Sequence, residues 1–457
     1  MSAPVFINRL LNMKKIKYIG LDMDHTLIRY HTERFEHLVF HLVTERLVKH
    51  KNYPEEVLSF KFNYHDAIRG LVIDIKRGNI IKLSRFGAIR NSFHGTRPLS
   101  YEEQKDIYYS VYVDLGDKDY IPVDTAFSIA YCVLYQQLVD LKDKYPHLLP
   151  DYECISEDVY KMVDLIHADG SLKNKVKDNL EDYVIRDEAL VEGLINYIDS
   201  GKKFFILTNS DYWYSNLLLD FAINPFLEKG KTWLDLFEYV ITFANKPRFF
   251  FDNLKFLHVN PESGLMSNLS GPMVPGVYQG GNATAFTNHL KVSGDEILYI
   301  GDHIYGDIVR LKKDCNWRTA LVVEELGQEI EGLNKTKDIN EQINQLMKEK
   351  EDLEEQILYL NMKPRAERSE SKIKEILAEI ADVDAELAQL IQKMETAFNP
   401  LWGRVFRSGA EETYFAYQME RFACIYMEKL SHLLQHSPMS YFRATRRLLP
   451  HEIKTML

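Results

Sequence analysis

The chain has no long apolar run, few cysteines and a deficit of positive charge, and each absence excludes a class of protein. No apolar stretch approaches the roughly 20 residues that cross a bilayer, and residues 1–6 do not have the pattern of a secretory signal peptide. We therefore expect a cytoplasmic protein with no membrane partner. The net charge of −11 argues against a nucleic-acid partner. Scattered cysteines without a C-x-x-C pair predict reduced thiols and no zinc site: Cys132, Cys154, Cys315 and Cys424.

The length and composition are those of an ordinary globular protein with more than one domain. Of the 457 residues, 46% are hydrophobic and 27% are charged. A chain of this length can bury a large core and carry a second domain.

Two acidic residues follow the first pattern of a buried strand. Residues 18–21 form a short apolar run, and Asp22 and Asp24 come directly after it. Residues i and i+2 of an extended chain point the same way, and ligands bind at the carboxyl ends of strands in open parallel sheets. Two adjacent carboxylates repel unless a cation separates them or one is protonated. The pair suits metal-assisted chemistry with a nucleophile and an acid/base, although a solvated turn has the same pattern.

Three more strand patterns each end in a group that phosphoryl transfer uses. The runs 203–207, 237–242 and 297–300 lead, in that order, into Thr208-Asn209-Ser210, into Lys246, and into the segment that carries Asp302 and Asp307. A phosphoryl site needs a nucleophile, a hydroxyl for the phosphate oxygens, a cation for the developing charge and carboxylates for Mg²⁺. The repeated pairing of strand and functional group argues against the solvated turn.

The four segments resemble, in order, the DxD, T/S, K and GDxxxxD motifs of the haloacid dehalogenase superfamily of aspartate-nucleophile phosphohydrolases. The chain is similar in particular to the cytosolic purine (IMP/GMP-preferring) 5′-nucleotidase family, through GLDMDHTL, HADGSLKNKV, LTNSDYWY, KPRFF, YIGDHIYGDI, FRSG and LLPHE. The resemblance implies an α/β fold, with a doubly wound Rossmann-like parallel sheet and an inserted mixed α/β cap. It also implies Mg²⁺-dependent hydrolysis of purine nucleoside 5′-monophosphates, with phosphotransfer to nucleosides as a second activity.

The resemblance assigns roles to the acidic residues. Asp22 would be the nucleophile that forms an aspartyl-phosphate, and Asp24 the acid/base for the leaving oxygen and the attacking water. One Mg²⁺ would be held by the Asp22 carboxylate, the backbone carbonyl of Asp24, and Asp302. Asp307 would orient a metal-bound water, or else be a helix cap or a surface acid.

The hydroxyl and lysine motifs complete the expected phosphate site. Thr208, Asn209 and Ser210 would donate hydrogen bonds to phosphate oxygens, although Thr208 could also cap a helix. Lys246 would neutralise the transferring group and Asp22, the alternative being a surface lysine.

Substrate selection is expected in the cap. By resemblance Asp164 would hydrogen-bond the edge of the base, His167 would stack on the ring, and Lys173 would reach the phosphate side. The sequence departs from the family at Tyr160, where an arginine is expected, and at Ala168, where a tyrosine is expected. These departures leave the choice among IMP, GMP and other purine monophosphates open.

We predict that the chain is divided into four parts. Residues 1–35 and 200–330 form the catalytic core, and residues 36–199 form the cap. Within the cap we expect a strand hairpin over 71–83 and mainly helices over 102–145 and 156–200, broken at Pro122 and Pro146. Residues 331–398 form a helical hairpin, because Ile339, Leu346, Leu353 and Leu360 recur every seven residues and a second apolar series follows the break near Pro364. Residues 399–457, with aromatic residues at helical spacing over 413–434, pack on the core or at a subunit interface.

The resemblance also implies a purine triphosphate activator and a homo-oligomer, either a dimer or a tetramer. The candidate effector residues are Tyr305 and Phe422 as aromatic faces, Lys313 for phosphates and Gln418 as a polar contact. A core or subunit contact would explain the same aromatic residues.

Two other functions remain open. One is a phosphatase of the same superfamily that acts on another small phosphate ester. The other is a nucleotide-sensing protein without turnover, although the complete set of motif residues argues against it.

Overall fold

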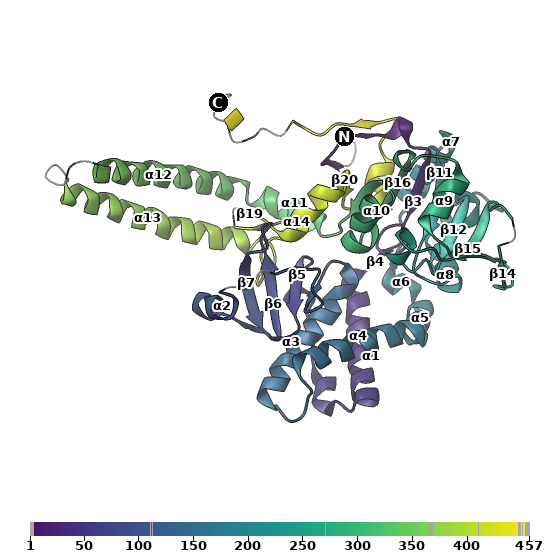
Figure 1. Cartoon of the computed structure of the whole chain (residues 1–457), viewed down its shortest axis with the longest axis horizontal. Helices are drawn as coiled ribbons and strands as arrows, with labels where there is room; N and C mark the ends of the chain where they lie inside the picture. The colour runs from purple at the N-terminus through teal and green to yellow at the C-terminus, as the bar shows by residue number, and fades with distance from the viewer. Residues whose placement is uncertain are drawn as a thin grey trace.

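The computed structural model describes residues 4–452, apart from residues 110, 112, 270, 363, 365–368, 410, 447–448 and 450. Figure 1 shows an α/β core, a second domain beside it and a long helical hairpin that projects away from both.

A ten-stranded sheet forms the core, in the order β1-β20-β17-β16-β3-β11-β12-β15-β13-β14. The strands from β20 to β15 pair in parallel, whereas the pairings of β1, β13 and β14 are antiparallel. The strands are β1 (Phe6–Ile7), β3 (Tyr18–Leu21), β11 (Lys203–Leu207), β12 (Tyr239–Thr242), β13 (Phe256–Val259), β14 (Met266–Asn268), β15 (Gly276–Gly280), β16 (Ile297–Gly301), β17 (Arg318–Val322) and β20 (Ile425–Met427). The predicted parallel α/β core is confirmed.

Both faces of this sheet are buried. In β11, Phe204 and Ile206 belong to one apolar cluster, and Phe205 and Leu207 belong to another. Alternate side chains of a strand point to opposite faces, so the two clusters lie on opposite sides. The first cluster takes side chains from α7 (Glu188–Asp199), α8 (Tyr212–Ala222), α11 (Leu326–Lys335), α14 (Tyr414–Phe422) and α15 (Leu430–Leu434), and the second takes them from α9 (Ala283–Leu290) and α10 (Arg310–Asp314).

The cap combines a small antiparallel sheet with a group of helices. Its sheet has the order β8-β7-β6-β5-β9, with β5 (Leu71–Asp74), β6 (Asn79–Leu83), β7 (Ile89–His94), β8 (Arg97–Pro98) and β9 (Tyr120–Pro122). Its helices are α1 (Thr32–Lys51), α2 (Tyr101–Tyr108), α3 (Ile129–Lys144), α4 (Tyr152–Ala168), α5 (Ser171–Asp178) and α6 (Leu180–Tyr183). A two-stranded sheet of β4 (Arg29–Tyr30) and β10 (Val184–Ile185) joins cap and core.

The predicted strand hairpin over 71–83 is confirmed, because β5 pairs antiparallel with β6 from Leu71↔Lys82 to Asp74↔Asn79. The expectation of mainly helices over 102–145, broken at Pro122, is confirmed by α2 and α3. Between them β9, which ends at Pro122, extends the cap sheet by pairing with β5.

The helical hairpin is confirmed. It consists of α12 (Lys337–Met362) and α13 (Glu370–Glu395), which lie side by side in Figure 1. Their shared seam is the apolar cluster of Leu353, Leu360, Ile376, Val383 and Leu387, flanked by partly buried residues such as Ile343 and Leu346. The seven-residue spacing therefore describes the contact between the two helices.

The aromatic stretch over 413–434 is not one helix. Helix α14 ends at Phe422, residues 425–427 form β20, and α15 begins at Leu430. Strand β20 pairs in parallel with β17 and antiparallel with β1, so this segment is part of the core sheet. Nearby short strands are β18 (Arg407–Ser408) with β19 (Glu411–Glu412), and β2 (Leu11–Asn12) with β21 (Tyr441–Phe442).

Among the described residues, no helix is both long enough and apolar enough to span a bilayer. The four cysteines are free thiols.

Candidate active site

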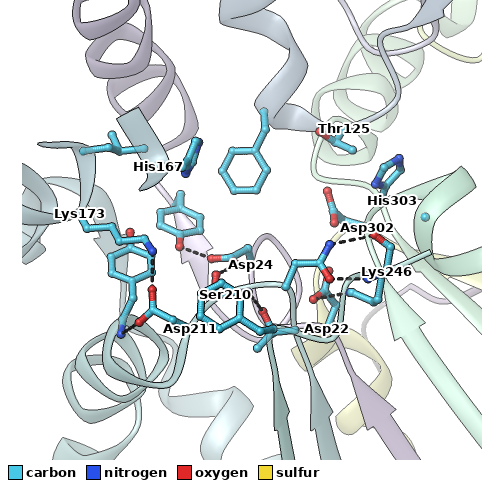
Figure 2. A pocket seen from close by; sticks show the side chains of 18 of the residues that line it. Asp22, Asp24, Thr125, His167, Lys173, Ser210, Asp211, Lys246, Asp302 and His303 are labelled. Atoms are coloured by element: carbon cyan, nitrogen blue, oxygen red, sulfur yellow. Dashed lines mark hydrogen bonds and ion pairs between the residues drawn. The ribbon is translucent and has the colours of Figure 1, made fainter. Parts of the chain in front are cut away.

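The predicted motif residues meet at one edge of the sheet. Strand β3 lies between β16 and β11, and β12 lies next to β11, so the segments after these strands are neighbours. They open into a cavity of about 860 Å³ whose lining includes Asp22, Thr208, Lys246 and Asp302. Figure 2 shows Asp22, Lys246 and Asp302 together on one side and Asp24 beside Ser210 on the other.

A glycine in β3 makes room for the floor of this site. A Cβ atom at Gly20 would lie 2.2 Å from Cζ of Phe205 and 2.8 Å from Cδ2 of Tyr299, closer than real side chains approach. The Tyr299 ring can therefore cross β3 from the neighbouring strand, and its hydroxyl donates to the Leu207 carbonyl at 3.1 Å. This hydroxyl also accepts a hydrogen bond from Lys246 at 3.0 Å.

Lys246 lies between two carboxylates. Its Nζ is 2.7 Å from Oδ1 of Asp22 and 2.8 Å from Oδ1 of Asp307. Burial opposes the charge, but the two carboxylates outweigh it and raise the pKa of Lys246 above its ordinary value. The lysine is therefore a fixed cation next to the expected nucleophile, not a surface residue.

Three carboxylates form a cluster that fits a divalent cation. One oxygen each from Asp22, Asp302 and Asp307 lies within 4.8 Å of the others. Burial raises the pKa of Asp22 well above its ordinary value and that of Asp302 to about 6. Oδ2 of Asp302 is buried and has no hydrogen-bond partner among the described residues. Buried carboxylate oxygens that lack donors are suitable ligands for a hard cation such as Mg²⁺.

The Asp24 side chain has different partners. Its Oδ1 accepts a hydrogen bond from the Tyr30 hydroxyl at 2.5 Å, and its Oδ2 accepts one from Ser210 at 2.9 Å. Burial, followed by the charge of Asp24, raises the pKa of Tyr30 well above its ordinary value, so the phenol stays protonated and can donate. Asp24 is thus held at the cavity wall, outside the cluster of three carboxylates.

The loop after β11 holds the lysine loop in place. The Asn209 side chain accepts from the Lys246 backbone N–H at 2.6 Å and donates to the Lys246 carbonyl at 3.1 Å. Thr208 is buried, and its hydroxyl accepts from the Ser210 backbone N–H at 3.0 Å. The cap of α8 is Asp211, so Thr208 does not have the alternative role of helix cap.

The predicted cap residues reach the same cavity. Asp164 and His167 lie on α4 and Lys173 lies on α5, and all three line the cavity. Burial lowers the pKa of His167 to about 4, so its ring is neutral at pH 7. The Lys173 ammonium forms an ion pair with Asp211, which lies at the start of α8.

Two contacts that sequence reasoning missed link the cap to the loop after β16, and a third links it to the segment after β17. His303 Nε2 lies 2.8 Å from a carboxylate oxygen of Asp124. The buried Arg69 guanidinium donates to the Asp302 carbonyl at 3.1 Å and to Glu325 at 3.0 Å. His303 lies inside a recognised motif and could have been noticed, whereas nothing in the sequence marks Asp124 or Arg69.

The candidate effector residues lie on three elements, and Lys313 is on α10. Tyr305 lies in the π-helix η9 (Ile304–Val309), which contacts α14, the helix that carries Gln418 and Phe422. Lys313 Nζ lies 5.7 Å from the centre of the Phe422 ring. A nucleotide site at these residues stays a prediction.

The chain is similar to several known proteins. Residues 5–454 match the model of the 5′ nucleotidase family. A 5′-nucleotidase domain-containing protein of Dictyostelium discoideum is 31% identical over 98% of this chain and 75% of its own length. Among solved structures, a HAD phosphatase from Thermococcus onnurineus matches 68% of this chain and 87% of its own, with 14% identity and a TM-score of 0.27. A β-phosphoglucomutase from a Pyrococcus species matches 68% of this chain and 88% of its own, with 11% identity and a TM-score of 0.29.

Proposed function

The chain belongs to the 5′ nucleotidase family and is a phosphoric monoester hydrolase, and we propose that it hydrolyses purine nucleoside 5′-monophosphates such as IMP and GMP in the presence of Mg²⁺. The observation that carries the proposal is the contact of Lys246 with both Asp22 and Asp307, beside the buried carboxylate of Asp302. This arrangement supplies a nucleophile, a fixed positive charge and a cation site within one cavity.

The proposed reaction has two steps. A carboxylate oxygen of Asp22 attacks phosphorus, the bond from phosphorus to the ribose O5′ breaks, and Asp24 gives its proton to O5′. In the second step a water attacks phosphorus, its proton passes to Asp24, and the Asp22–phosphate bond breaks to release phosphate. Lys246 compensates the negative charge that gathers on the phosphoryl oxygens.

The donor set suits a magnesium ion. Asp22 and Asp302 would hold it with the backbone carbonyl of Asp24, and Asp307 would orient a water on it. When bound, Mg²⁺ supplies positive charge to the phosphate oxygens and lowers the repulsion between carboxylates. The unpartnered Asp302 oxygen and the raised pKa values in the cluster support this assignment.

For the purine we propose the cap side of the cavity. His167 is neutral at pH 7 and would lie against the ring, and Asp164 would accept from the edge of the base. Lys173 has Asp211 as its partner, so reaching a phosphate requires it to leave that ion pair. We propose that these contacts determine the preferred base, together with Ala168, which also lines the cavity where the family has a tyrosine.

The test is phosphate release from a panel of purine and pyrimidine 5′-monophosphates and sugar phosphates, with Mg²⁺ and with EDTA. We expect release from IMP or GMP in Mg²⁺ only. If the protein prefers a sugar phosphate, its assigned function changes from nucleotidase to another phosphatase. If it turns over none of these esters, the result favours a nucleotide-sensing protein.

We also propose phosphotransfer to nucleosides, because a covalent intermediate can react with an alcohol in place of water. Labelled inosine with unlabelled GMP should yield labelled IMP. Hydrolysis of GMP without labelled IMP would reject the transfer and leave the hydrolysis in place.

Activation by a purine triphosphate and a homo-oligomeric state are further proposals from the family resemblance. ATP or GTP at fixed free Mg²⁺ should raise IMP hydrolysis, and Tyr305→Ala should lose that response. An equal rate with and without either nucleotide would reject the activator.

A further inference from the structure

Tyr30 makes the shorter of the two hydrogen bonds that the Asp24 side chain accepts. Its hydroxyl lies 2.5 Å from Oδ1 of Asp24, whereas the hydroxyl of Ser210, on the cavity-lining loop after β11, lies 2.9 Å from Oδ2. The two carboxylate oxygens therefore have partners of different kinds. One partner is a buried phenol, and the other is a hydroxyl that the substrate can engage.

The surroundings of Tyr30 leave its ring little freedom. The residue is 3% exposed and lies in β4, where it pairs with Val184 of β10. Its ring centre is 4.8 Å from that of Phe35 and 5.0 Å from that of His25. Packing on several sides fixes where the hydroxyl points, so the hydrogen bond to Oδ1 has a defined direction.

We propose that Tyr30 is a positioning residue that anchors Oδ1 of Asp24, so that Oδ2 is the atom that exchanges the proton with the leaving oxygen. This inference rests on the proposed function and adds a division of roles within it. When a phosphate ester enters, Ser210 turns its hydroxyl to a phosphate oxygen and releases Oδ2. Tyr30 keeps its bond to Oδ1, and the free oxygen then faces the ester oxygen.

The role predicts an effect that depends on the leaving group. A ribose 5′-oxygen leaves poorly as an alkoxide and needs the proton from Asp24, whereas p-nitrophenolate leaves without one. The quantity kcat/KM reports the steps up to the break of the ester bond, so it isolates the proton donation from the later attack of water.

The experiment compares Tyr30→Phe with wild type on IMP and on p-nitrophenyl phosphate, both with saturating Mg²⁺. The substitution keeps the ring and its packing and removes only the hydroxyl. We expect kcat/KM on IMP to fall at least about tenfold, through kcat more than KM, and kcat/KM on p-nitrophenyl phosphate to fall less than about threefold.

Tyr197→Phe is the matched control. Tyr197 is also buried, and its hydroxyl donates to the Leu433 carbonyl at 3.0 Å, away from the residues that line this cavity. Its ratio of the two kcat/KM values should equal that of wild type. The thermal midpoints of both variants establish that they are folded.

Equal losses of Tyr30→Phe on both substrates, or no loss on IMP, would overturn the positioning role. A different outcome would reject the proposed function: the wild-type enzyme would cleave p-nitrophenyl phosphate but no nucleotide. The comparison then uses the best alkyl phosphate of the panel in place of IMP, and the same two outcomes decide the role of Tyr30.

Discussion

At the residue scale, the site is a balance of buried charges around Lys246. The side chains of Asp22 and Asp307 are 11% and 1% exposed, and their shared partner, Lys246, is 5% exposed. A buried charge without a partner is strongly destabilising, so each of these groups depends on the others. In the proposed reaction the same lysine compensates the charge of the phosphoryl oxygens, so substrate binding would change its contacts with the two carboxylates.

Lys246→Met should therefore weaken the fold as well as the chemistry. With EDTA at pH 7 we expect a loss of about 3 kcal/mol in the free energy of unfolding, because two buried carboxylates lose their cation. Mg²⁺ should raise the thermal midpoint of this variant more than that of wild type, and kcat should fall by about 10²–10³.

Lys203→Met is the control for this variant. Lys203 is 52% exposed and pairs with Glu238, so its loss should change stability by less than about 1 kcal/mol. Equal thermal midpoints for the two variants would show that the Lys246 ion pairs do not stabilise the protein.

At the element scale, a buried acid links two cap helices. Glu36 of α1 is fully buried, and its Oε2 accepts from the Ala130 backbone N–H, in the first turn of α3, at 2.7 Å. Burial raises the pKa of Glu36 from 4.5 to about 8, against the opposing effects of the Ala130 N–H and His25. The carboxyl is therefore protonated in the folded cap at neutral pH.

This shift predicts a stability that falls as pH rises. Between about pH 4.5 and 8 the unfolded chain has lost the proton that the folded chain keeps, so the free energy of unfolding decreases with pH, by up to about 1.4 kcal/mol per unit. Glu36→Gln has no proton to lose. Its stability relative to wild type should rise steadily from pH 5 to 8, as measured by urea unfolding.

Glu33→Gln, on the exposed face of α1, is the matched control and should show no such trend. A constant difference between Glu36→Gln and wild type across this range would contradict a buried, protonated Glu36.

The hydrophobic pattern of the sequence predicted those strands and helices that are specified by their own residues. The apolar runs before Asp22, Thr208 and Lys246 predicted buried strands, and the seven-residue spacing predicted the hairpin. Strand β20 was not predicted, because three residues are too few to show a hydrophobic period. Its position in the sheet depends on pairing with β17 and β1, which are far away in the sequence. The partners of Asp24 and Asp302, Tyr30 and Arg69, were missed for the same reason, since only tertiary contacts bring them to the site.

At the scale of the whole molecule, the hairpin of α12 and α13 stands apart from the chemistry. Its apolar seam is internal, and none of the motif residues lies in it. In Figure 1 it projects from the core, on the side away from the cap helices α5 and α6. Its two ends lie close together, because the helices are antiparallel neighbours.

Replacing residues 337–395 with a short Gly/Ser linker should leave Mg²⁺-dependent activity on IMP within about tenfold of wild type, because the site keeps all its contacts. As a second variant in the full chain, Val383→Asp places a charge in the seam and should melt the hairpin without loss of activity. A folded deletion protein without activity would contradict this separation of hairpin and catalysis.

The central claim is that Asp22 forms a covalent bond to the transferred phosphoryl group. The most direct measurement is phosphate release from IMP by purified Asp22→Asn in saturating Mg²⁺, next to wild type, with thermal unfolding to show that the variant is folded. Loss of a nucleophile removes the covalent route, so we expect a fall of at least about 10⁴ in kcat. Phosphate release by folded Asp22→Asn at a rate near that of wild type would contradict the mechanism.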